Sequence, residues 1–119
     1  MVIGDLFHGL LRKRDYEYFV NKARGLFASA RSEADPEKKV ALVEQTRQVL
    51  VQAMKYDNTQ PDAYIMRAKV WMAFQESDDD LVCAKQDLQR AMRVCKDCHK
   101  QAEKLMSQVT MRLSNSRAM

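Results

Sequence analysis

The chain has 119 residues, a formal net charge of +4, and only three glycines and two prolines. This length supports one compact core. So few turn-forming residues exclude β-sandwiches and β-barrels, which need a turn every few residues. Ala, Leu, Met, Lys, Arg, Glu and Gln dominate the composition, and these are good helix formers. We therefore predict a small all-α protein of about five helices.

The 20 basic residues are spread evenly, with ten before residue 61 and ten after residue 60. An even distribution does not favour a nucleic-acid-binding face, which normally shows clustered cations. A membrane-spanning helix needs about 20 consecutive apolar residues, and no stretch of the sequence approaches that length. The three cysteines are an odd number and do not make a disulfide framework. We expect an intracellular protein, cytoplasmic or mitochondrial, with no nucleic acid as a partner.

Residues 1–14 form the first predicted element, an N-terminal amphipathic arm. Apolar residues recur in it at helical spacing and a basic cluster closes it. The residues that define the arm are Ile3, Leu6, Phe7, Leu10, Arg12, Lys13 and Arg14. Three outcomes are open: the arm docks on a protein partner, docks on an anionic membrane surface, or packs back on the helix that follows.

Residues 15–113 are predicted to form a single helical domain, followed by a polar tail at residues 114–119. The expected helices begin near residues 16, 36, 61, 78 and 98. Asp15 is placed to cap the first of them. Asp35-Pro36 is typical of a cap followed by proline at the first helical position. The acids at residues 78–80 suit a helix N-terminus better than a metal site.

Small and apolar residues at fixed places give the chain an internal period. The better-matched stretch is marked by Pro61, Asp62, Ala63, Ala68, Trp71, Ala84, Leu88 and Ala91. This pattern resembles the tetratricopeptide repeat, a helix–turn–helix unit of about 34 residues. The resemblance covers roughly residues 16–113, as two divergent repeats plus a capping helix. It departs from the family where Arg67 replaces a small residue and Lys96 replaces a proline, and in a longer turn at residues 76–80.

The resemblance implies a tetratricopeptide-like α–α superhelix in which the first helix of each pair lines a concave groove. Aligning Ala23 with Ala68 assigns a partner-binding groove to Val20, Arg24, Phe27, Ile65, Lys69 and Met72. Arg24 and Lys69 would then lie about one repeat apart over an apolar floor. We expect such a groove to bind an amphipathic or extended segment whose acids flank apolar anchors.

The sequence Cys95-Lys96-Asp97-Cys98-His99 is the one motif with a specific chemistry. CxxCH is the attachment signature of c-type haem. The segment is also similar to the zinc-binding part of a deaminase-like domain in some plant organelle editing factors, but that domain needs a His-x-Glu, which neither His8 nor His99 provides. A structural zinc would need a fourth ligand, and Cys83 lies too far along a continuous helix to share an ion with Cys95. We expect Cys95 and Cys98 to be small buried side chains, with haem, zinc and a redox-active pair as alternatives.

No phosphate-binding loop, nucleophile motif or paired carboxylates occur in the sequence, so no catalytic residue, cofactor or metal is assigned. We expect a non-enzymatic protein–protein interaction module, an adaptor or accessory subunit of a multi-subunit assembly. Two repeats are few, since stacked repeats usually need about three to bury their faces. The alternatives are a small CxxCH protein carrying haem or zinc, and a membrane-surface protein anchored by the N-terminal arm.

Overall fold

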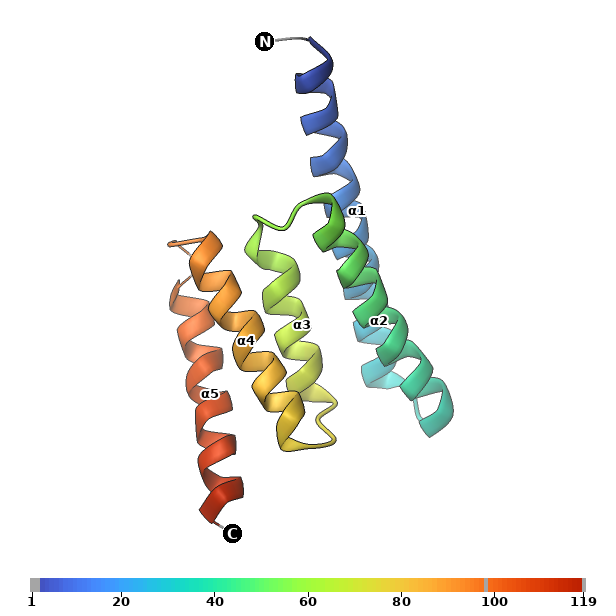
Figure 1. Cartoon of the computed structure of the whole chain (residues 1–119). Coiled ribbons are helices and arrows are strands. Elements are labelled where there is room, and N and C mark those ends of the chain that lie inside the picture. The colour runs from blue at the N-terminus through green and yellow to red at the C-terminus, as the bar shows by residue number, and fades with distance from the viewer. Residues whose placement is uncertain (1–2, 98, 119) are drawn as a thin grey trace. The chain divides into compact units, whose positions relative to one another are not determined.

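The computed structural model describes the backbone of residues 3–97 and 99–118, and the side chains of residues 9–97 and 99–116. These residues form five α-helices and no strand. The helices are α1 (Ile3–Ser32), α2 (Pro36–Tyr56), α3 (Pro61–Ala73), α4 (Asp78–Val94) and α5 (His99–Ala118) (Figure 1). The predicted all-α fold of about five helices is confirmed. None of the helices in the described chain combines the length and hydropathy that crossing a bilayer requires.

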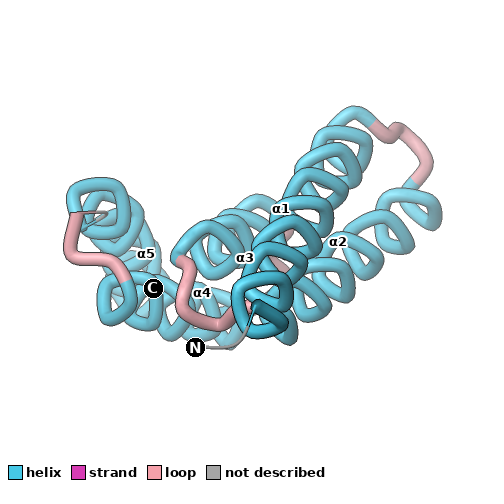
Figure 2. Tube along the Cα trace, turned by 90° about the horizontal axis from the view of Figure 1, so that it is seen from above, coloured by secondary structure: helices cyan, strands magenta, loops and turns pink. Residues whose placement is uncertain are grey.

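The chain divides into two compact units, one ending at Asn58 and the other beginning at Thr59. Unit 1 holds α1 and α2, which run antiparallel, and unit 2 holds α3, α4 and α5, also joined by tight reversals (Figures 1 and 2). The division falls in the connection between α2 and α3.

In unit 1, α1 is one continuous helix from Ile3 to Ser32, so the predicted arm and the predicted first helix are a single element. Asp15, the expected cap between them, lies within the helix, where its carboxylate is 3.6 Å from Nε of Arg14. Residues 12–16 contain no glycine or proline, so nothing in them favours a break. An arm that continues the helix in a straight line cannot also pack back on it.

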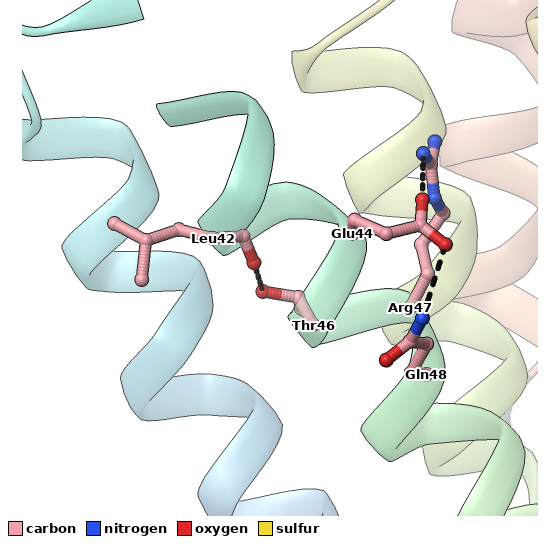
Figure 3. A network of polar contacts seen from close by, with 5 residues as sticks. All are labelled: Leu42, Glu44, Thr46, Arg47 and Gln48. Atoms are coloured by element: carbon pink, nitrogen blue, oxygen red, sulfur yellow. Dashed lines mark hydrogen bonds and ion pairs between the residues drawn. The ribbon is translucent and has the colours of Figure 1, made fainter. Parts of the chain in front are cut away.

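The two helices of unit 1 pack through a stripe of apolar and small side chains. The buried residues are Tyr16, Val20, Ala23 and Ala30 on α1, and Val43, Thr46, Leu50 and Ala53 on α2. The alanines have no bulk beyond Cβ, so the two backbones can approach closely. The one polar side chain in this stripe is satisfied locally, because the hydroxyl of Thr46 donates a 2.7 Å hydrogen bond to the carbonyl of Leu42 (Figure 3).

The first helix extends well past the end of the second (Figure 1). At 1.5 Å per residue, the 30 residues of α1 span about 45 Å and the 21 residues of α2 about 32 Å. Tyr56 marks the end of α2, and its ring stacks on Phe19 of α1 with the centroids 5.5 Å apart. We call residues 3–14 of α1, which lie beyond this contact, the overhang.

Local chemistry sets the predicted helix starts. The carboxylate of Asp35 accepts a 3.1 Å hydrogen bond from the amide of Glu37, and Pro36 occupies the first turn of α2. Pro61 likewise opens α3. The acids at residues 78–80 lie in the first turn of α4, and a carboxylate oxygen of Asp80 accepts a 2.8 Å hydrogen bond from the amide of Glu76. Asp80 therefore helps to close the turn between α3 and α4.

In unit 2 the core lies where α4 packs against α3 and α5. It consists of Ala68, Met72, Leu81, Ala84, Leu88, Ala102 and Val109, and Trp71, Met92, Leu105, Met106 and Leu113 pack against it. Arg112 of α5 donates a 2.9 Å hydrogen bond to the carbonyl of Met72, and the hydroxyl of Ser116 donates to Asp78 at 2.7 Å. Within the polar tail expected at residues 114–119, the helix continues through Ala118.

Candidate interaction surface

The overhang of α1 presents apolar and basic side chains to solvent. Leu10 is 67% exposed, and Tyr18, two turns further along, is 60% exposed. Arg12, Lys13 and Arg14 are exposed between them. The predicted residues Ile3, Leu6 and Phe7 belong to the helical backbone of α1, and their side chains lie outside the described set. The structure thus brings the described part of the predicted arm together on one uncovered stretch of helix.

The exposed apolar residues lie on the side of α1 that faces away from α2. A helix turns about 100° per residue, so Leu10 and Tyr18 are each roughly 140° around α1 from Ala23. Ala23 is fully buried on the side that packs against α2. The apolar side of α1 therefore changes between residues 11 and 16. In the overhang it faces away from the side on which α2 packs, and in the hairpin it faces α2. A longer α2 would not cover the outward side.

Half of the predicted groove residues lie on α1. Val20 is buried in the core of unit 1. Phe27 is half-buried, and the guanidinium of Arg31 lies 5.6 Å from its ring centroid. Arg24 is exposed and donates a 2.7 Å hydrogen bond to the side-chain oxygen of Asn21. The accessible chemistry of α1 at these positions is therefore mainly cationic.

The other half of the predicted groove lies on α3. Ile65 and Met72 are buried, and Met72 belongs to the core of unit 2. Lys69 is exposed. In each unit, apolar residues assigned to the groove floor lie in the interior, while the cation stays at the surface. A buried stripe and a groove floor have the same helical spacing in a sequence, so periodicity could not distinguish them.

The CxxCH segment joins α4 to α5. Cys95 is the C-cap of α4, and its amide donates a 3.1 Å hydrogen bond to the carbonyl of Ala91. It is half-buried and disulfide-bonded rather than a buried apolar thiol. His99 opens α5, and its Nε2 lies 2.8 Å from the carbonyl oxygen of Met92. Cys98 lies outside the described residues. Both described members of the motif are therefore engaged with protein groups.

The remaining polar side chains give no indication of a second kind of site. In residues 9–97 and 99–116, no three His, Cys, Asp or Glu side chains are grouped so that they could hold a metal ion. Every buried side-chain nitrogen or oxygen in that part of the chain has a hydrogen-bond partner. These groups are used to hold the fold together.

A buried ion pair that the sequence pattern did not predict joins α3 to α4. Arg67 donates from Nε and Nη2 to the two carboxylate oxygens of Asp87, at 2.9 and 2.7 Å. Asp87 is only 2% exposed, and Nη1 of Arg90 lies 3.5 Å from it. Hydrogen bonding to Asp87 raises the pKa of the Arg67 guanidinium, although burial acts in the opposite direction. Two features of the sequence could have predicted this pair. Arg67 stands where the repeat pattern has a small residue, and Asp87 lies on the otherwise apolar side of α4.

Comparison with protein-family models, with curated proteins and with solved structures gives no match for this chain. The resemblance to the tetratricopeptide repeat therefore depends on the sequence pattern alone.

Proposed function

We propose that this protein is a non-enzymatic protein–protein interaction module, an adaptor or accessory subunit of a larger assembly. The observation that carries the proposal is an exposed apolar side of α2. Val40 is 62% exposed and Val51 is 39% exposed. They are eleven residues apart, which is about three helical turns, so they lie on the same side of the helix.

These valines are exposed because unit 1 has only two helices. Each helix has one neighbour within the unit, and the buried stripe of α2 is used in that contact. Valine is a weaker helix former than alanine or leucine, so an exposed valine does little for α2 itself. Complete burial of one valine side chain contributes about 1.5–3 kcal/mol. Two of them aligned on one side give a partner helix apolar surface to bury.

A charged pair lies between the two valines. Nη2 of Arg47 is 2.7 Å from Oε2 of Glu44, and Nε2 of Gln48 is 3.5 Å from Oε1 of the same carboxylate (Figure 3). The hydrogen bond from Arg47 and its positive charge lower the pKa of Glu44. We call Val40, Glu44, Arg47 and Val51 the α2 seam. Its spacing is that of a helix–helix contact, in which polar residues between apolar ones fix the register of the partner helix.

The exposed side chains of unit 2 have a different character. The exposed residues of α5 are polar apart from Met111, and include Lys100, Gln101, Glu103, Lys104, Ser107 and Gln108. On α4, Val82 and Val94 are 40% and 37% exposed. They are twelve residues apart, which is about 120° around the helix, so they do not line up on one side as Val40 and Val51 do.

Affinity purification of the full chain, with quantitative mass spectrometry of the co-purifying chains, tests the proposal. Val40→Asp/Val51→Asp should lose partners that the wild type captures, with affinity reduced more than about a hundredfold. Ala41→Asp/Gln52→Asp is a matched control, because both of its sites are exposed, eleven residues apart on α2, and carry the same change in charge. Equal capture by the two variants, both shown to be helical by circular dichroism, would refute the proposal.

The cofactor alternative has its own test. Haem or zinc at the CxxCH segment would require Cys95 to be reduced. An absorption spectrum and a metal assay on the purified protein separate the two classes. An interaction module gives neither signal, whereas a Soret band or stoichiometric zinc would favour the cofactor protein.

A further inference from the structure

We propose that the overhang of α1 docks on an anionic lipid surface. This surface is distinct from the α2 seam, since it involves other residues on another helix. Either proposal can fail without the other.

The overhang separates apolar from polar positions around the helix. Its backbone is helical from Ile3, and at about 100° per residue positions 3, 6, 7, 10 and 11 fall within roughly 140° of the circumference. These positions hold Ile, Leu, Phe, Leu and Leu, whereas positions 4, 5, 8 and 9 on the other side hold Gly, Asp, His and Gly. An apolar side this broad is typical of a helix lying in a membrane interface, and is wider than a coiled-coil seam.

A flat surface can reach this apolar side without meeting the rest of unit 1. The second helix packs on the opposite side of α1, where Ala23 and Ala30 are fully buried. Leu10 and Tyr18 are on the outward side and are mostly exposed. Because α1 is continuous, the hairpin holds the overhang as a straight extension (Figure 1). A bilayer could therefore contact the outward side along several turns.

The charges near the overhang favour an anionic surface over a neutral one. Arg12, Lys13 and Arg14 are all exposed. Asp5 is the only acid in residues 1–14; Asp15 and Glu17 follow, and Asp15 lies 3.6 Å from Arg14. Each cation close to an anionic membrane strengthens binding by about fivefold. Tyr18 follows the cations, and tyrosine is enriched where a protein meets the headgroups of a membrane. The overhang itself thus carries three cations and one acid, and Tyr18 lies about one turn beyond it.

Vesicle flotation of the full chain tests the proposal. The probes are phosphatidylcholine vesicles with and without phosphatidylserine. We expect the chain to float with the phosphatidylserine vesicles, to be released by added salt, and to bind pure phosphatidylcholine weakly. Absence of binding to the anionic vesicles, or equal binding to both kinds, would overturn the proposal.

A single substitution tests the apolar contact. Leu10→Gln should weaken binding to phosphatidylserine vesicles on the order of tenfold, because a leucine side chain no longer enters the interface. Met111→Gln is the matched control, since Met111 is about equally exposed but lies on α5. The control should stay within about twofold of the wild type, given the small effect expected of a surface site outside the contact. Equal losses in the two variants would contradict the proposed docking side.

A triple substitution tests the charges. Neutralising the basic cluster should weaken binding on the order of a hundredfold, whereas neutralising three exposed cations elsewhere in unit 1 should have a much smaller effect. The test variant is Arg12→Gln/Lys13→Gln/Arg14→Gln and the control is Lys22→Gln/Lys38→Gln/Lys55→Gln. If anionic vesicles do not bind, and the test variant instead loses a co-purifying protein that the α2 seam variant keeps, the overhang is a protein-docking site and the lipid proposal is wrong.

Discussion

Breaking the ion pair between Arg67 and Asp87 should destabilise unit 2 more than removing an exposed charge does. Arg67→Met retains an unbranched apolar side chain but removes both hydrogen bonds to a carboxylate that is only 2% exposed. Removing one partner of a buried pair costs about 3–5 kcal/mol. Arg90 remains 3.5 Å from the carboxylate, and a half-exposed pair of this kind contributes up to about 1 kcal/mol. The expected loss in free energy of unfolding is therefore about 2–4 kcal/mol.

Two further variants test whether the loss of stability comes from the unpaired carboxylate of Asp87 or from substitution in general. Arg67→Met/Asp87→Leu replaces the pair by apolar side chains, so no buried charge is left unpaired. Its stability should return to within about 1 kcal/mol of the wild type, because well-packed apolar replacements of buried pairs are often neutral. Arg90→Met removes only the more distant and more exposed cation, and should cost less than about 1 kcal/mol.

Urea unfolding of the full chain measures these differences. Trp71 is the only tryptophan of the chain. It packs against the core of unit 2, so its fluorescence follows that unit, while circular dichroism follows all the helices. A loss below about 1 kcal/mol for Arg67→Met, or a double variant as unstable as the single one, would refute the reasoning.

Three further predictions concern single contacts. Asp35→Ala should lower the stability of unit 1 by about 1 kcal/mol, because α2 loses its N-cap; an unchanged melting curve by circular dichroism would contradict this. Glu44→Gln should cost a few tenths of a kcal/mol near neutral pH, since its pair with Arg47 is exposed. The pKa of Glu44 is lowered from its ordinary 4.5, so this contribution is present above that pH and is lost as the pH falls through the folded-state value; urea titrations at neutral and acidic pH should show the wild-type advantage only at neutral pH. Arg112→Met should cost about 1 kcal/mol in unit 2, because the carbonyl of Met72 loses a donor, and a tryptophan-fluorescence transition identical to that of the wild type would rule this out.

Helix starts could be predicted because their causes are local. Asp35 and Pro36 act on amides within one turn, and the acids at residues 78–80 act on the first turn of α4. The buried stripes could be predicted for a similar reason, since a helix repeats every 3.6 residues whatever it packs against. Ala23, Leu50 and Leu88 are fully buried, as this repeat indicates.

The candidate surfaces were harder to predict because exposure depends on distant parts of the chain. The spacing that placed Val20 and Ile65 in a groove is also the spacing of a core, and both side chains are buried. The arm was predicted as a separate element because Asp15 can cap a helix, but a capping residue also occurs inside helices when nothing next to it breaks them. The sequence could not show that α2 ends opposite Phe19.

The sequence by itself determined that this protein is helical, where most of its helices begin, and which side of each helix is apolar. These properties follow from interactions within about four residues along the chain. Only the tertiary structure decided that α1 runs on past α2, leaving Leu10 exposed on the side away from the hairpin. Only the tertiary structure brought Arg67 to Asp87, twenty residues away in sequence. Burial and long-range pairing depend on what lies opposite a residue once the helices have packed, and that information is absent from the local pattern.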